Sequence, residues 1–237
     1  MATETDNIPF QRAADADAWA EKRLLPFGHP VSEALKFAAE NQVKSGLPDI
    51  AVSPLQGKFL AVQCTLIKAK NALEFGTLGG YSTIWIASSS PEMKVTSIEY
   101  DAHHKKVAEE SIANAGLSDR VQVLQGAGLK VLPQVQKEVK EGKRERFDFV
   151  FIDADKENNT NYVNGAIEIC NPGACIIVDN VGRRGRIAID EEARTDPRVQ
   201  GSREVIEAAG KDPRLEATLV QTVGDKGYDG FLLCVLK

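Results

Sequence analysis

The chain has 237 residues, of which 43% are apolar and 27% charged, a composition typical of a folded globular protein rather than a fibrous or disordered one. Its 29 basic and 34 acidic residues give a formal net charge of −5, which excludes the basic surface expected of a nucleic-acid-binding protein. No apolar run approaches the roughly 18 residues that a membrane span needs. The acidic N-terminus and the four cysteines without CxxC spacing predict a reduced, cytoplasmic protein that lacks a signal peptide.

The first part of the chain has helical periodicity. Ser53 followed by Pro54 is typical of a helix start, because serine caps the first turn and proline suits its first position. A turn is expected over residues 26–30, and residues 1–69 as a whole form an N-terminal helical segment. The three expected helices lie at about Trp19–Leu25, Val31–Lys44 and Leu55–Lys68.

From residue 70 onwards, short apolar runs alternate with helical windows. Seven strands are predicted, at Ala72–Phe75, Val95–Glu99, Val121–Leu124, Phe147–Ile152, Ala174–Asp179, Ala217–Val223 and Phe231–Leu236. Helices fit between the first six strands, for example at Asp101–Ala115, so we expect βαβ units and a mostly parallel sheet. The last two strands are separated only by a turn-rich loop, residues 224–230, and should pair antiparallel. The predicted fold class is therefore a single-domain α/β protein whose core covers residues 70–237.

A glycine-rich turn follows the first predicted strand. Gly76, Gly79 and Gly80 allow the backbone to turn tightly before a helix, but their Gly-x-x-Gly-Gly spacing is not the GxGxxG of dinucleotide sites. Glu74, just before the turn, would repel a pyrophosphate and suits a cofactor with a cationic ammonium or sulfonium. Glu99 ends the next strand, where an acid can accept hydrogen bonds from both hydroxyls of an adenosine ribose.

Small residues follow the third predicted strand. Gly126, Ala127 and Gly128 would let an adenine ring lie flat against the backbone. Each of these features alone is also typical of an ordinary turn between a strand and a helix. Together, the acidic strand ends, the glycine turn and the small residues indicate a cationic cofactor that contains adenosine.

Oxygen-bearing side chains follow the fourth and fifth strands. Asp153 leaves the fourth strand, and Asp179 and Asn180 leave the fifth. If these strands are neighbours, three hard oxygen ligands meet at one point, and such a set selects Mg²⁺, Mn²⁺ or Ca²⁺ rather than zinc. A single strand-end Asp or Asn more commonly caps a turn, but three of them at adjacent strand ends favour a metal site.

Lys156 lies three residues after Asp153, at the start of a predicted helix. An isolated lysine is usually a solvated charge. A lysine beside a metal site is instead a candidate general base, because an amine can take a proton from a bound hydroxyl group.

These residues resemble those of the cation-dependent, S-adenosylmethionine (SAM)-dependent O-methyltransferases of the caffeoyl-CoA O-methyltransferase group, which is related to catechol O-methyltransferase. The resemblance extends from about Ile50 to the C-terminus and is strongest in Ala72–Ser82, Phe147–Lys156, Gly173–Asn180 and residues 212–216. It implies a Rossmann-like class I methyltransferase fold, with helices on both faces of a seven-stranded sheet and an antiparallel last strand. It also implies a homodimer to whose interface the N-terminal helices contribute.

The resemblance implies a role for each site residue. Glu74, Gly76 and Ser82 match positions that hold the methionine part of SAM, Glu99 matches the ribose position, and Lys156 matches the catalytic lysine. The expected SAM-binding residues are Val52, Glu74, Gly76, Thr77, Ser82, Glu99, Gly126, Ala127, Gly128, Asp153 and Asp155. The expected ligands of the divalent cation, most simply Mg²⁺, are Asp153, Asp179 and Asn180.

Three departures from the plant members concern the acceptor. Arg184 replaces an asparagine that contacts substrate, the final hairpin carries the extra residues Lys226–Asp229, and the N-terminal segment matches poorly. The resemblance is therefore closer to microbial and fungal relatives that act on free catechols or flavonoids. Glu99 replaces an aspartate, and both residues accept hydrogen bonds from a diol.

The predicted function is metal-dependent transfer of a methyl group from SAM to one of two vicinal hydroxyls of a phenolic, catechol-type or flavonoid acceptor. An acyl-CoA acceptor of the caffeoyl-CoA type is the alternative. An NAD(P)-dependent dehydrogenase is disfavoured by the glycine spacing and by the lack of a Tyr-x-x-x-Lys pair. A cofactor-binding scaffold without chemistry is disfavoured by the intact ligand set and lysine.

Overall fold

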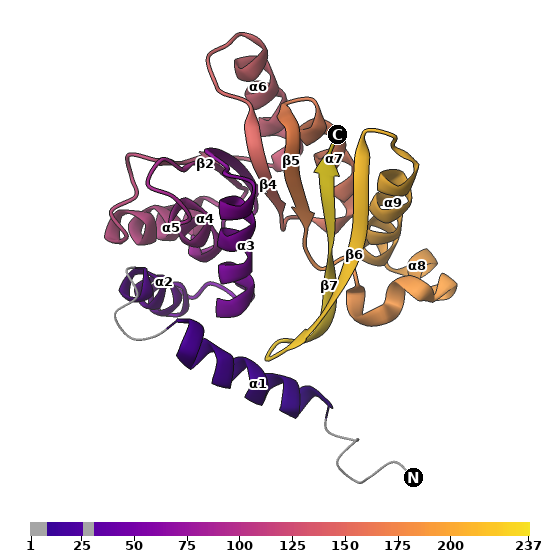
Figure 1. The fold of residues 1–237 in the computed structure, drawn as a ribbon, viewed down its shortest axis with the longest axis horizontal. Coiled ribbons are helices and arrows are strands. Elements are labelled where there is room, and N and C mark those ends of the chain that lie inside the picture. Colours follow the sequence, from indigo (N-terminus) through magenta and orange to yellow (C-terminus); the bar gives the residue numbers. More distant parts are fainter. Residues whose placement is uncertain (1–8, 26–30) are drawn as a thin grey trace.

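The computed structural model describes residues 9–25 and 31–237, which are built around one central sheet (Figure 1). The strands follow the order β3-β2-β1-β4-β5-β7-β6 across this sheet. Their bounds are β1 Asn71–Phe75, β2 Lys94–Glu99, β3 Val121–Gln125, β4 Phe147–Ile152, β5 Cys170–Val178, β6 Leu215–Gly224 and β7 Gly227–Leu236. The helices are α1 Pro9–Leu24, α2 Ser32–Lys44, α3 Pro54–Leu66, α4 Tyr81–Ala87, α5 Ala102–Asn114, α6 Gly128–Lys140, α7 Asn159–Ile167, α8 Asp190–Thr195 and α9 Pro197–Lys211, with the 3₁₀ segments η2 Lys156–Asn158 and η3 Arg183–Ala188.

The topology predicted from the alternating pattern is confirmed. Strands β1 to β5 pair in parallel, with helices connecting them. The last strand, β7, pairs antiparallel with both β5 and β6. Parallel pairs need a helical crossover whereas β6 and β7 are joined by a short turn, so the change of direction follows from the connection.

Successive residues of each strand point to opposite faces of the sheet and supply two apolar layers. Leu73, Phe75 and Val150 pack with residues of α6, α7 and α9 on one face. Ala72 and Phe149 pack with residues of α2, α3, α4 and α5 on the other. Because both faces are covered, the central strands are continuous apolar runs in the sequence. They could therefore be predicted from the sequence alone.

The predicted length of the loop over residues 224–230 is wrong. Strands β6 and β7 continue to Gly224 and from Gly227, so only Asp225 and Lys226 form the turn. Gly227 adopts a φ of +90°, which permits this tight reversal. The long hairpin reaches the N-terminal helix α1 (Figure 1), where Asp17 Oδ2 accepts a hydrogen bond from the Asp225 amide at 3.1 Å.

Helices α2 and α3 lie close to their predicted positions, whereas α1 begins at Pro9, well before the predicted start at Trp19. Ser53 caps α3 by accepting a hydrogen bond from the Gln56 amide at 3.3 Å, with Pro54 at the first helical position. Helix α3 ends at Leu66, before Lys68, whose φ of +54° is left-handed. The turn predicted over residues 26–30 lies outside the described residues. Over residues 9–25 and 31–237, no helix combines the length and apolar character needed to cross a membrane.

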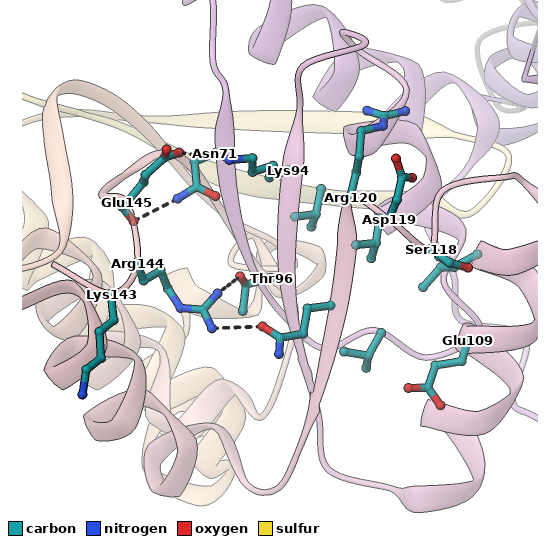
Figure 2. Close-up of a pocket in the computed structure, with 15 residues that line it drawn as sticks. Asn71, Lys94, Thr96, Glu109, Ser118, Asp119, Arg120, Lys143, Arg144 and Glu145 are labelled. Atoms are coloured by element: carbon teal, nitrogen blue, oxygen red, sulfur yellow. Dashed lines mark hydrogen bonds and ion pairs between the residues drawn. The ribbon is translucent and has the colours of Figure 1, made fainter. Parts of the chain in front are cut away.

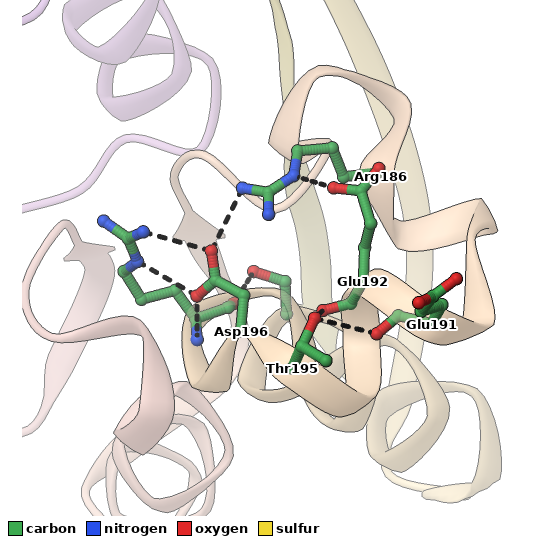
Figure 3. A network of polar contacts seen from close by, with 7 residues as sticks. Arg186, Glu191, Glu192, Thr195 and Asp196 are labelled. Carbon is green, nitrogen blue, oxygen red and sulfur yellow. Dashed lines mark hydrogen bonds and ion pairs between the residues drawn. The ribbon is translucent and has the colours of Figure 1, made fainter.

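A network of charged side chains joins η3 to helices α8 and α9 (Figure 3). Arg186 lies between Glu192, which accepts from its Nε, and Asp196, whose Oδ2 is 3.0 Å from its Nη1. Asp196 also accepts from Arg198 at 3.0 Å and caps α9. The Arg198 guanidinium, the Arg198 amide and Arg186 lower the pKa of Asp196 well below its usual range. The network fixes the segment that follows β5.

Candidate active site

The carboxyl ends of β1, β4 and β5 meet at one edge of the sheet. Phe75 is paired with Ile152, and Ile152 with Val178, so the residues that follow these strands are neighbours. The Asp153 amide donates to the Phe75 carbonyl at 2.8 Å. Gly76 has a φ of +94°, and a Cβ there would lie 2.3 Å from the Asp153 carbonyl oxygen. Only glycine lets the turn after β1 approach the end of β4 this closely.

Two carboxylates and a lysine lie together at this edge. The Asp179 amide donates to the Ile152 carbonyl at 2.9 Å, which places Asp179 beside Asp153. Lys156 Nζ is 2.6 Å from Asp153 Oδ1, and its side chain is only 10% exposed. Burial, followed by the negative charge of Asp153, raises the pKa of the Asp179 carboxyl. The site therefore holds more negative charge than Lys156 neutralises.

The donor set at this edge fits a hard divalent cation. Asn180 follows Asp179 with a left-handed φ of +55°, which asparagine tolerates, and its side chain makes no hydrogen bond to the described part of the chain. Two carboxylates and one amide oxygen are the ligand types that Mg²⁺ and Mn²⁺ prefer. No group of three His, Cys, Asp or Glu side chains suited to a metal occurs within residues 9–25 and 31–237. A metal here would thus depend on the Asn180 amide as well as on Asp153 and Asp179.

Glu74 is completely buried in β1, on the sheet face covered by α4. Its carboxylate accepts hydrogen bonds from Ser82 Oγ and Ser97 Oγ, both at 2.6 Å, and from the Thr83 hydroxyl. Burial raises the pKa of Glu74 to about 7, although these hydroxyl donors act in the opposite direction. Thr77, in the glycine turn, hydrogen bonds to Ser97 at 2.5 Å. Glu74 therefore fixes the turn and the start of α4 through hydroxyl groups.

Glu99 binds the same turn from β2. Its Oε2 accepts hydrogen bonds from the amides of Thr77 at 3.0 Å and Leu78 at 2.8 Å. Its Oε1 accepts from the Asp101 amide at 2.9 Å and lies 3.5 Å from His104 Nδ1. The side chain is buried, and any ribose hydroxyl would share its oxygens with these donors.

The remaining predicted cofactor residues lie on neighbouring connections. A Cβ at Gly128 would lie 2.6 Å from the Tyr162 ring, whose hydroxyl donates to Asp155 Oδ1 at 2.5 Å, so Gly128 and Asp155 approach one side chain. Gly126 and Ala127 connect β3 to α6. Val52 is buried before α3, next to Ala51, whose carbonyl accepts a hydrogen bond from Lys226 Nζ at 2.6 Å.

The sequence analysis did not predict several contacts of the candidate site. Gln56 Nε2 donates to Asp179 Oδ2 at 2.8 Å, although 123 residues separate them. Tyr162 holds Asp155, and Ser97 holds Glu74. Ser97 had no distinctive signal, because β2 also contains the polar residues Thr96 and Glu99. Gln56 and Tyr162 lie on helices, where nothing in the local pattern marks them.

A cavity of about 920 Å³ lies at the other end of the sheet (Figure 2). It is lined by Asn71 and Lys94, the first residues of β1 and β2, and by Thr96 and Arg144. Arg144 donates to Thr96 at 2.5 Å and to Gln122 at 3.0 Å. None of the predicted site residues lines this cavity, so its size does not make it the active site.

Comparison with known proteins gives consistent matches. The O-methyltransferase family model matches residues 29–236. The chain is 45% identical over 221 residues to O-methyltransferase imqG of Aspergillus flavus, covering 93% of this chain and 90% of that protein. It is 43% identical to a catechol O-methyltransferase of Niastella koreensis (86% and 90% covered) and 30% identical to a caffeoyl-CoA O-methyltransferase of Eucalyptus globulus (85% and 81%). The crystal structure of an O-methyltransferase from Bacillus cereus in complex with SAH has a TM-score of 0.89 at 41% identity, covering 96% and 100%.

Proposed function

The chain belongs to the O-methyltransferase family, and we propose that it transfers the methyl group of SAM to one hydroxyl of a catechol-type phenol with the help of a divalent cation. The observation that carries this proposal is the meeting of Asp153, Asp179 and Lys156 beside the turn at Gly76. The complex of the Bacillus cereus relative with SAH, the product that SAM leaves after methyl transfer, supports SAM as the donor.

In this proposal, SAM lies across the carboxyl ends of β1, β2 and β3. The turn at Gly76 and Thr77, with Ser82, receives the methionine part, and Glu99 receives the ribose. Gly126, Ala127, Gly128 and Asp155 border the adenosine, and Val52 and Asp153 complete the expected set of binding residues. Because Glu74 is fully buried, its proposed effect on the cationic donor comes from its charge and from orienting Ser82.

Asp153, Asp179 and Asn180 would hold the cation, most simply Mg²⁺. Such an ion, when bound, supplies positive charge to two vicinal oxygens of the acceptor and lowers a phenol pKa that begins near roughly 10. Asp179 is buried and the charge of Asp153 raises its pKa, which supports this assignment because a divalent cation relieves the repulsion between the two carboxylates.

Lys156 is the proposed general base. In the reactive state its Nζ is the uncharged amine, which takes the proton of the reacting hydroxyl, and Asp153 Oδ1, 2.6 Å away, stabilises the resulting ammonium. The phenolate oxygen then attacks the methyl carbon, the bond between that carbon and sulfur breaks, and the electron pair remains on sulfur. Holding both reactants close together supplies much of the acceleration.

A free catechol or flavonoid is the proposed acceptor rather than an acyl-CoA. The catechol O-methyltransferase of Niastella koreensis is 43% identical to this chain and the caffeoyl-CoA enzyme 30%, which supports this choice. Arg184, an exposed residue with φ of +56°, and the hairpin turn at Lys226 differ from the plant pattern. A homodimer formed through the N-terminal helices, a cytoplasmic location and a single domain over residues 1–237 remain predictions.

The test is transfer of labelled methyl from SAM to caffeic acid, caffeoyl-CoA and a catechol-bearing flavonoid, each with Mg²⁺ and with EDTA. We expect methylation of a free catechol that EDTA abolishes. Methyl transfer that EDTA does not affect would refute the requirement for a divalent cation. Preference for caffeoyl-CoA would establish the alternative acceptor. SAM binding without methyl transfer to any of the three acceptors would favour the alternative of a cofactor-binding scaffold without catalytic activity.

A further inference from the structure

The Asp179 carboxylate is held from two sides by different parts of the chain. Its Oδ1 accepts the amide hydrogen of Asn180 at 2.8 Å, and its Oδ2 accepts from Gln56 Nε2 at 2.8 Å. The first contact is local to the end of β5. The second comes from helix α3, so Gln56 fixes the rotation of the carboxylate from outside the sheet.

Gln56 is itself held firmly in place. It lies in the first turn of α3, where its amide donates to the cap residue Ser53 at 3.3 Å. A Cβ at the next residue, Gly57, would lie 2.2 Å from Cδ1 of Trp85, so α3 packs directly on α4. Helix α4 is tied in turn to Glu74 through Ser82. The backbone at Gln56 is therefore fixed by the helix cap before it and by the packing of Gly57 after it.

The charges at this edge explain why a neutral donor suits this position. Asp153 already contacts Lys156, whereas Asp179 is buried and has no side-chain cation within hydrogen-bond distance in the described residues. A lysine in place of Gln56 would neutralise Asp179 and compete with an incoming cation. A glutamine amide orients the carboxylate and leaves its negative charge available.

We propose that Gln56 is a positioning residue for the divalent cation, acting by fixing the Asp179 carboxylate, an inference that rests on the metal site of the proposed function. Residues that orient a metal-binding carboxylate typically alter metal affinity by about 10- to 100-fold when they are replaced. A purely structural role in docking α3 would instead lower stability and leave metal affinity unchanged.

The experiment is a Mn²⁺ titration followed by electron paramagnetic resonance, with neither SAM nor acceptor present. Gln56→Met keeps the side-chain length and removes the donor, and we expect it to weaken Mn²⁺ binding by about 10- to 100-fold. Gln63→Met is the matched control, because Gln63 lies two turns further along α3 and its side chain makes no hydrogen bond to the described residues. SAH affinity in EDTA and the melting temperature report on the fold of each variant.

Gln56→Met with wild-type Mn²⁺ affinity would overturn the inference, as would an equal loss in Gln63→Met. If wild-type protein fails to bind Mn²⁺, the metal site of the proposed function fails and the role of Gln56 fails with it. Should Gln56→Met not fold, Gln56→Asn provides the same test, because its amide is one methylene too short to reach Asp179 unchanged. Wild-type affinity in Gln56→Asn would likewise count against the inference.

Discussion

The molecule contains two clusters of carboxylates in opposite electrostatic settings. At the carboxyl ends of the strands, Glu74 and Asp179 are buried and their pKa values are raised. Beside α8 and α9, Asp196 contacts Arg186 and Arg198 and its pKa is lowered. The second cluster is neutralised by the chain itself. The first is not, which is the condition expected where a cationic ligand binds.

The difference separates charge that stabilises the fold from charge kept for a ligand. Exposed ion pairs contribute little each and act by fixing local geometry. Buried carboxylates with too few cations destabilise the unliganded protein, so their presence indicates a function that requires them. The variants below test each side of this comparison.

The largest effect is expected from Lys156→Met, which removes the cation that contacts Asp153. If Lys156 is the general base, kcat should fall by about 10²- to 10⁴-fold at pH 7 and recover partly near pH 9.5, because more of the phenol ionises in solution. The measurement is kcat against pH with Mg²⁺ present. Lys105→Met, on α5 where Lys105 pairs with Glu109, is the control. An unchanged kcat at pH 7 would refute the role of Lys156 as general base.

A smaller effect, on stability, is expected from Glu74→Gln. Burial raises the pKa of Glu74 to about 7, so the folded state binds this proton more tightly than the unfolded state. The resulting stabilisation is complete below the unfolded pKa, near 4.5, and is lost as the pH rises through 7. The whole contribution is on the order of 3 kcal/mol.

Glu74→Gln should therefore flatten the decrease in unfolding free energy of the ligand-free protein between pH 5 and pH 8. Urea unfolding at several pH values measures this slope. Glu110→Gln, on the exposed side of α5, is the matched control and should keep the wild-type slope. Equal slopes in the wild type and Glu74→Gln would mean that Glu74 is ionised without cost in the folded protein.

Much of the fold was predictable because the central strands are buried on both faces. Phe147–Ile152 was identified with its observed bounds for that reason. The length of the β6–β7 turn was not, because Gly224, Gly227 and Gly230 indicated a longer, turn-rich loop. In the structure, cross-strand pairing continues through these residues, and pairing between distant positions leaves no local signal.

In the candidate site too, residues with a local sequence signal were predictable and contacts between distant parts of the chain were not. Asp153 and Asp179 were identifiable because they follow apolar strands, and parallel topology brings such ends together. Gln56 was not identifiable, because its contact with Asp179 depends on how α3 packs against α4. Strand ends can be located from sequence periodicity. A contact between a helix side chain and a strand end can be identified only once the packing of that helix is known.

The smallest effect is expected from Arg186→Met, in the neutralised cluster. Arg186 is about one-third exposed and Asp196 keeps its contact with Arg198, so the melting temperature should fall by less than about 4 °C. The difference from wild type should shrink in 1 M NaCl, which screens exposed charges. Methyl transfer should remain at the wild-type rate.

This last variant also tests whether the two clusters are independent. Arg186 belongs to η3, which begins three residues after Asn180, so the network could in principle hold the metal-binding end of β5. The hairpin supports that end separately, because the Val181 amide donates to the Gly230 carbonyl at 2.9 Å and the Arg183 amide donates to Asp229 Oδ1 at 2.8 Å. Loss of Mn²⁺ binding in Arg186→Met would show that these contacts are insufficient and that the surface network positions the site.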